Sequence, residues 1–346
     1  MSETDALTTV KPILSQYGMR PHYVEKIGSA YKIYSNLGTF ALKEASPYKG
    51  MNFVRNIHLL FQKGYNRIVP IYPTPDGRYA VLYQNRLFYL MPWVANEHTE
   101  DRSSKQKQLF RELARLHTLS LKEVELTEED TANHYEETKA AWEKESLMLD
   151  EIIEACEQKW YMSPFELMFC TYYHNVKQAL QFAIRKLDDW YEKAKDSKKM
   201  RMVIVHGKVA PDHFLFDERG YGYFINFEES RYAAPHHDLL PYVARECEGQ
   251  PKQNEDIVEW IYTYTNHFAL RDPEIDLLIS YLAYPLPIIQ VLEKYYKSTS
   301  KFNQYKAVRE LQQKFWILKN TEYIVMRMDE IEKQKKQAKE GAQTEG

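Results

Sequence analysis

The sequence has few cysteines, no long apolar run and no secretory signal pattern. It has three cysteines (Cys156, Cys170 and Cys247), an odd number without metal-type spacing, so we expect packed, reduced thiols rather than a disulfide scaffold or a zinc site. No apolar run approaches the length that spans a bilayer. The acidic first five residues lack the basic and apolar regions of a secretory signal. We therefore expect a protein without a transmembrane segment that is made in a cytoplasm.

An excess of positive charge is also missing. Lys and Arg number 46 against 49 Asp and Glu, a net charge of −3, so no electrostatic feature indicates nucleic acid or an anionic membrane as a partner. Hydrophobic residues make up 44% of 346 residues, which is enough for a large core and two domains or lobes. The 27 tyrosines are scattered. They suit ordinary half-buried positions best, although an interface or dityrosine cross-links would use them too.

Residues 206–228 carry the most specific pattern. An apolar run at 202–205 leads into His206-Gly207, a loop follows, and the apolar triplet 214–216 precedes a turn and a second apolar strand that ends at Asn226. This is the local form of a phosphotransferase catalytic loop followed by its metal-binding segment. Phosphoryl transfer requires an acceptor beside the attacking hydroxyl and oxygen ligands for magnesium, both held at the ends of rigid strands.

The stretch resembles the loop of the aminoglycoside phosphotransferase and choline kinase superfamily, written His-Gly-Asp, four residues, Asn, and later Ile-Asp-Phe followed by an acid. The residues that match are His206, Gly207, Pro211, Leu215, Phe216, Ile225, Phe227 and Glu228. The resemblance places Lys208 at the position of the base and His213, Asn226 and Glu228 at the metal positions. It also makes Asp238, in Ala-Pro-His-His-Asp-Leu, a residue that steadies the loop.

Three of these positions, Lys208, His213 and Asn226, differ from the family in charge or in the type of metal ligand. The ammonium of Lys208 has three donors and no acceptor, and Asn226 removes a negative charge that would face a hard dication. The sequence therefore predicts no catalytic residue and no metal site, as in a pseudokinase, and leans against an enzyme. The alternative is a rearranged centre, in which Asp212, Glu228 or Asp238 binds the metal and Lys208 holds phosphate.

Residues 1–92 predict a small N-lobe of antiparallel strands with one helix. A short amphipathic helix at 10–17 precedes this pattern. Lys43 ends a strand that resembles the one carrying the nucleotide-phosphate lysine, but the following helix contains no Glu to pair with it. Main-chain groups at Met91 and Trp93 would complete a nucleotide cleft. The strands are expected at 23–27, 31–35, 39–43, 68–72, 79–84 and 87–91, and the helix at 51–63.

Residues 93–346 predict a large, mainly helical C-lobe. The residues near 121–200 form a helical insertion rich in aromatic side chains, which either walls an acceptor pocket or docks a protein. His117 is expected to be structural, and the pair at 236–237 to bind no metal. Helices are expected near 104–120, 131–161, 164–194, 256–268, 272–284 and 305–334, with frayed residues from 333 to 346. The fold class is α+β, a bilobal protein-kinase-like fold.

Within the superfamily, the segments 66–71, 90–93 and 110–117 resemble spore coat proteins of the CotS type from endospore-forming bacilli, in particular the YsxE type. The resemblance implies synthesis in the mother-cell cytoplasm, deposition in the spore coat, and other coat proteins as partners. Our first hypothesis is a non-catalytic, structural or scaffolding component of coat assembly that needs no cofactor. The alternatives are a phosphotransferase with a rearranged active site, which would use ATP and magnesium, and a nucleotide binder without turnover.

Overall fold

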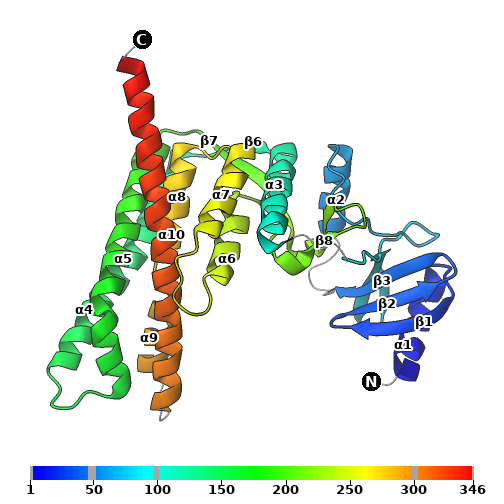
Figure 1. Cartoon of the computed structure of the whole chain (residues 1–346), viewed down its shortest axis with the longest axis horizontal. Coiled ribbons are helices and arrows are strands. Elements are labelled where there is room, and N and C mark those ends of the chain that lie inside the picture. The colour runs from blue at the N-terminus through cyan, green and yellow to red at the C-terminus, as the bar shows by residue number, and fades with distance from the viewer. Residues whose placement is uncertain (1–2, 46–51, 97–100, 298–302, 345–346) are drawn as a thin grey trace. The chain divides into compact units, whose positions relative to one another are not determined.

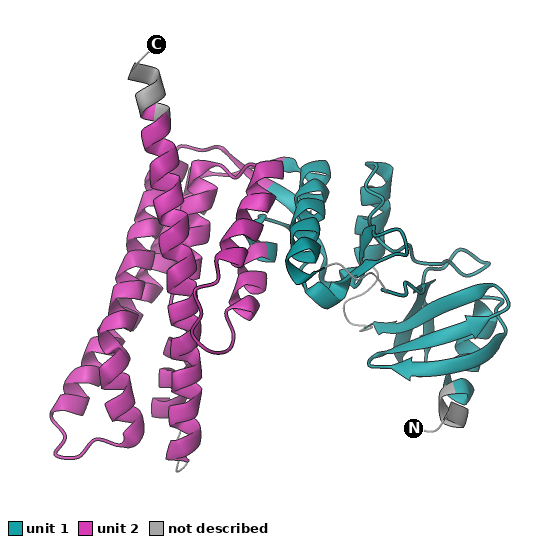
Figure 2. Ribbon diagram, in the orientation of Figure 1, with its two compact units in different colours: residues 1–122, 202–238 teal, residues 123–201, 239–346 magenta. Residues whose placement is uncertain are grey.

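The computed structural model describes residues 3–45, 52–96, 101–297 and 303–344. Its contacts group the chain into two compact units (Figure 2). Unit 1 consists of residues 1–122 and 202–238, and unit 2 of residues 123–201 and 239–346. These units differ from the two lobes, 1–92 and 93–346, that the sequence predicts. The boundary between the lobes at residues 92 and 93 stays a prediction.

Unit 1 contains a five-stranded antiparallel sheet, as expected for the N-lobe (Figure 1). The strand order is β1-β2-β3-β5-β4. Val10, Ile13 and Leu14 of α1 (Glu3–Gln16) pack against buried side chains of the sheet, including Ile33 and Leu90. The strands are β1 (Pro21–Ile27), β2 (Ala30–Ser35), β3 (Gly38–Ala45), β4 (Val81–Tyr83) and β5 (Arg86–Pro92).

The strand expected at 68–72 was wrong. Only isolated bridges occur there, from Ile68 to Phe224 in parallel and from Tyr72 to Leu90 in antiparallel orientation. Pro70 and Pro73 explain the difference, because proline has no N–H to donate to a ladder. The stretch instead ties the first sheet to the segment around Phe224.

The remainder of unit 1 positions residues 206–228, the segment that resembles a phosphotransferase loop. β10 pairs antiparallel with β7, and β8 pairs antiparallel with β9. Ser120, at the end of α3, accepts a hydrogen bond from Ile204 N (3.0 Å) and thereby fixes that helix to β7. The elements are α2 (Asn52–Gln62), α3 (Arg102–Ser120), β7 (Lys199–Val205), β8 (Phe214–Phe216), β9 (Gly222–Phe224) and β10 (Arg231–Ala233), with single 3₁₀ turns at Pro211–His213 and Phe227–Glu229.

Unit 2 is mainly helical, as expected for the C-lobe. The helices α4 and α5 each begin with a capping box, at Thr127 and at Ser163. Each of these side chains accepts a backbone N–H that would otherwise be unpaired in the first turn of the helix. The last helix continues to Thr344, so the fraying expected from residue 333 was wrong. The elements are β6 (Lys122–Glu125), α4 (Glu128–Glu157), α5 (Pro164–Ala194), α6 (His236–Glu246), α7 (Glu255–His267), α8 (Asp272–Ala283), α9 (Leu286–Lys297) and α10 (Gln304–Thr344).

One apolar stretch in unit 2 is longer than the sequence analysis expected. Residues 272–297 contain an 18-residue window with a mean hydropathy of 1.6, which is long and apolar enough to cross a membrane by length and composition alone. The stretch comprises α8 and α9, with Pro285 between them. Because 67% of that window is buried inside the structure, core packing accounts for its composition.

Candidate functional site

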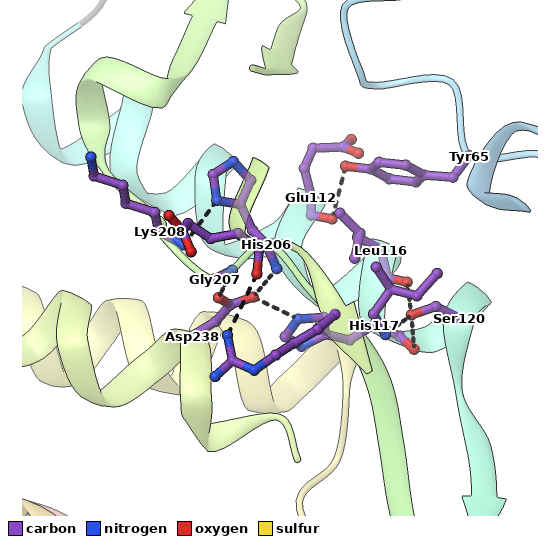
Figure 3. Close-up of polar contacts among 12 residues, drawn as sticks. Tyr65, Glu112, Leu116, His117, Ser120, His206, Gly207, Lys208 and Asp238 are labelled. Carbon is purple, nitrogen blue, oxygen red and sulfur yellow. Dashed lines mark hydrogen bonds and ion pairs between the residues drawn. The ribbon is translucent and has the colours of Figure 1, made fainter. Parts of the chain in front are cut away.

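The loop that follows β7 is organised by one buried carboxylate, that of Asp238 (Figure 3). Its two oxygens accept the backbone N–H groups of His206 and Gly207, each at 2.7 Å. His117 Nε2 lies 3.1 Å from Oδ2 and donates to it, since an ionised carboxylate only accepts. Burial by itself would raise the pKa of Asp238, but the bonds from His117 and Gly207 outweigh it and lower the pKa. Asp238 is therefore a fixed anion that holds the loop.

His206 is a second buried anchor of the loop. Its Nε2–H donates to Ile225 O (2.7 Å), and its Nδ1 accepts the backbone N–H of Lys208 (3.2 Å). Because each ring nitrogen has one role, these two bonds require the neutral ring. Burial lowers the pKa of His206, which favours the same neutral form. The residue therefore joins the start of the loop to the segment that contains Ile225 and Asn226.

Two backbone conformations explain residue choices at the site. Gly207 has φ +80°, and a Cβ there would collide with the carbonyl group of Glu229. Asn226 has φ 68° and ψ 51°, a left-handed conformation that asparagine tolerates better than most residues. Gly207, which matches the family pattern, and Asn226, which differs from it, therefore both suit the backbone conformation at their positions.

Lys43 has a partner, which the sequence analysis did not find. Its Nζ forms an ion pair with Glu228 Oε1 and a hydrogen bond of 2.6 Å with Asn226 Oδ1. Tyr89, directly opposite Lys43 in the β3–β5 pair, donates its OH to the same Glu228 oxygen (2.6 Å). The sequence predicts no carboxylate partner on the helix after β3, whereas the structure supplies one from a segment 185 residues away.

Charge and burial act in opposite directions at Glu228. Burial by itself would raise the pKa of this carboxyl group, but the Lys43 ammonium and the hydrogen bonds from Lys43 and Tyr89 outweigh it and lower the pKa. Burial, followed by the charge of Glu228, raises the pKa of Tyr89 well above its usual range. The cluster therefore consists of an anion, a lysine that neutralises it and a neutral phenol.

The structure brings five of the predicted site residues together. They line a pocket of about 280 Å³ in unit 1 with Ser29, Glu44, Ala45 and Glu229, and they are Lys43, Lys208, His213, Asn226 and Glu228. The side chain of Lys208 is exposed, and Figure 3 shows it extending away from Asp238. His213 Nδ1–H donates to Lys208 O (2.8 Å). The pocket therefore contains four residues that the family resemblance assigned to the base and metal positions, together with Lys43.

Other predicted site residues lie elsewhere. Asp212 lines a separate pocket of about 450 Å³ with Arg102 and Lys105. Trp93 N donates to Thr39 O (3.0 Å), so that main-chain group is already engaged, while Met91 pairs with Ala41 inside the sheet. Of the three carboxylates considered as substitute metal ligands, only Glu228 lines the pocket of Lys43. Within the described ranges, no group of three or more His, Cys, Asp or Glu side chains is arranged to hold a metal ion.

Stability is expected to fall as the pH drops from about 7 to 5. Burial lowers the pKa of both His206 and His213 below their ordinary value of 6.5. In this range the unfolded chain therefore binds protons that the folded chain does not, which favours unfolding as the pH falls. Urea unfolding across this pH range measures the effect. The variant His213→Asn, whose side chain does not titrate, should show a smaller slope; an unchanged slope, or stability that rises on acidification, contradicts the assignment.

The chain is similar to several solved structures of phosphotransferases and of a choline kinase. An aminoglycoside phosphotransferase from Alicyclobacillus acidocaldarius matches with a TM-score of 0.65 at 14% identity, over 92% of this chain and 96% of that one. Spectinomycin phosphotransferase, in complex with ADP and spectinomycin, matches with a TM-score of 0.53 at 14% identity, over 93% and 99%. Choline kinase LicA from Streptococcus pneumoniae matches with a TM-score of 0.47 at 18% identity, over 92% and 99%. The first two confirm the predicted kinase-like fold class.

A family model described as "Spore coat putative kinase YutH" matches residues 10–340, nearly the whole chain. No curated protein matches. The match confirms the CotS-like spore coat assignment, with YutH as the type where the sequence analysis named YsxE. The chain belongs to the YutH family of spore coat kinase-like proteins.

Proposed function

We propose that the protein is a structural or scaffolding component of spore coat assembly that does not carry out magnesium-dependent phosphoryl transfer. The observation that carries the proposal is the ion pair between Lys43 and Glu228. Both side chains are largely buried, with 14% and 17% exposed. A magnesium ion at this carboxylate would compete with the ammonium for the same negative charge, and displacing the ammonium would leave it without this partner in a poorly solvated place.

The donor set around that ion pair also does not suit magnesium. This ion prefers six oxygens with near-octahedral geometry and usually takes one or two carboxylates from a protein. At the family's metal positions the pocket offers the Glu228 carboxylate, which is already bonded to Lys43 and Tyr89, and the amide of Asn226, which is bonded to Lys43. Glu44 and Glu229 also line the pocket, but Glu44 pairs with Arg86, and within the described residues these carboxylates form no group of three or more ligands arranged to hold a metal ion. His213 and Lys208 stand at the other two family positions, one a nitrogen ligand and one a cation.

At the position of the base, Lys208 offers no acceptor while it is charged. Its side chain is exposed, so it lacks the burial by which enzymes neutralise a lysine for proton abstraction. The exposed Asp212 lines another pocket, and Asp238 is committed to His117, His206 and Gly207. None of the three candidates, Lys208, Asp212 and Asp238, is therefore placed to act as a base instead of the family's carboxylate.

One observation favours a second candidate, nucleotide or phosphate binding without turnover. Two ammonium groups, those of Lys43 and Lys208, line the same pocket. Lysine is a competent phosphate ligand, and two cations would compensate part of the charge that magnesium compensates elsewhere. In this version a bound nucleotide stabilises the fold and is not consumed.

Thermal melting of the purified chain with ATP, with and without magnesium, tests the proposal. We expect no magnesium-dependent rise in Tm and no consumption of ATP, because the metal positions lack free carboxylates. A rise without magnesium that disappears in Lys43→Met would support the second candidate. Brisk, magnesium-dependent ATP turnover that Lys208→Ala abolishes would refute the scaffold proposal and establish the rearranged phosphotransferase.

The family supports a place for the protein in the coat. We propose synthesis in the mother-cell cytoplasm followed by deposition around the developing spore, with other coat proteins as partners. The absence of a predominant charge sign, at a net charge of −3, agrees with protein partners rather than nucleic acid.

A further inference from the structure

One end of unit 2 carries large side chains that the fold leaves in solvent. Trp160 is 90% exposed and Tyr161 is 84% exposed, in the loop between α4 and α5, and Leu167 in the first turns of α5 is 59% exposed. Tyr305, in the first turn of α10, is 74% exposed. We call these four side chains the aromatic end. Aromatic rings contribute most to folding or binding when they lose water, so such exposure indicates an interaction site.

Packing holds the two elements of the aromatic end side by side. Phe165, in the first turn of α5, stacks on Tyr295 of α9 with ring centroids 3.8 Å apart. Its N–H donates to Gln304 Oε1 at the start of α10 (3.3 Å), and the hydroxyls of Ser163 and Tyr295 lie 3.1 Å apart. The α4–α5 loop and the start of α10 therefore share one end of the unit, which is the lower end in Figure 1.

The two elements carry opposite charges. Glu151, Glu154 and Glu157 are exposed on the last two turns of α4, and Lys306 and Arg309 are exposed on the first turns of α10. None of these five forms an ion pair within the residues that the structure describes. Neighbouring charges are already matched, as in Lys159–Glu166, Lys294–Glu310 and Lys297–Glu293. The aromatic end thus has an acidic flank on the α4–α5 hairpin and a basic flank on α10.

We propose that the aromatic end binds a second copy of the chain. In a two-fold arrangement the acidic flank of each copy faces the basic flank of the other, and the rings pack between them. An anionic membrane or a polybasic segment would be attracted by one flank and repelled by the other, whereas a second copy satisfies both. The three rings expose roughly 500 Å² of the about 800 Å² that each partner contributes to a standard interface.

This self-association goes beyond the proposed function and does not depend on the nucleotide pocket. Its first test is the mass of the full-length chain by sedimentation and light scattering over a range of concentrations. We expect a dimer whose dissociation constant rises about tenfold or more in Trp160→Ala/Tyr161→Ala, because exposed central rings dominate interface energy. Raising the salt concentration should also weaken it. As matched controls, Leu37→Ala and Leu82→Ala alter side chains that are 60% and 61% exposed in unit 1 and should leave the dimer unchanged.

A charge exchange gives the sharper test. The variant Glu154→Lys/Glu157→Lys makes both flanks basic, and Lys306→Glu/Arg309→Glu makes both acidic, so each alone should be monomeric. Mixed in equal amounts, the two variants should form a heterodimer, since each reversed flank then meets an oppositely charged one. A wild-type chain that stays monomeric, a mixture that does not associate, or rings that instead bind vesicles of phosphatidylglycerol and phosphatidylcholine would overturn the proposal.

Discussion

Replacing Asp238 by alanine is expected to lower the free energy of unfolding by about 3–5 kcal/mol. The carboxylate accepts the N–H of the buried His206, the N–H of the partly buried Gly207 and a bond from the fully buried His117. Without it, the backbone donor of His206 and the ring nitrogen of His117 are left unsatisfied inside the structure, the Gly207 donor also loses its partner, and each buried unpaired donor costs about 1–3 kcal/mol.

Urea unfolding at neutral pH measures this effect. Asp212→Ala is the matched control, because it removes an exposed carboxylate from the same loop and is expected to change stability by no more than about 0.5 kcal/mol. Asp238→Asn keeps one acceptor oxygen and should lie between the two. If Asp238→Ala lowers the free energy of unfolding as little as Asp212→Ala does, then the Asp238 carboxylate does not hold the loop in place.

Restoring the two missing acids is expected to create magnesium-dependent nucleotide binding. In Lys208→Asp/Asn226→Asp, a cation and a neutral amide become carboxylates in the pocket that also contains Glu228. We expect the affinity for ADP with magnesium to rise about 100-fold or more, at about 1.5–3 kcal/mol for each added bond to a charged group. Aspartate also tolerates the left-handed backbone of residue 226, so the change should not strain the fold.

Calorimetric titration with ADP, in magnesium and then in a chelator, measures this gain. The pair Lys208→Ala/Asn226→Ala removes the same side chains without adding charge and separates the restored acids from the mere loss of Lys208. If ADP binding by the double aspartate variant is still independent of magnesium, then the Lys43–Glu228 ion pair is sufficient to prevent magnesium binding. In that case the charges at positions 208 and 226 do not decide whether magnesium binds.

Local sequence signals predicted the fold well where local chemistry decides it. The capping box of Ser163 and Glu166, with Pro164 at the first helical position, gave the observed start of α5, because those groups satisfy one another within a single turn. Alternating apolar residues gave the strands of the first sheet. The pattern failed at 68–72, where apolar residues alternate with prolines and the segment joins two distant parts of unit 1 through single bridges.

The sequence by itself determined which chemical groups are present at the catalytic loop. The lysine at 208, the histidine at 213 and the asparagine at 226 are present whatever the fold is, and they differ in charge or ligand type from the residues that the family resemblance leads one to expect at these positions. Only the tertiary structure decided what the remaining acids do: Glu228 pairs with Lys43, Asp238 holds the loop backbone, and Asp212 lies in another pocket. These pairings join residues far apart in the chain, and they depend on packing that no local periodicity encodes.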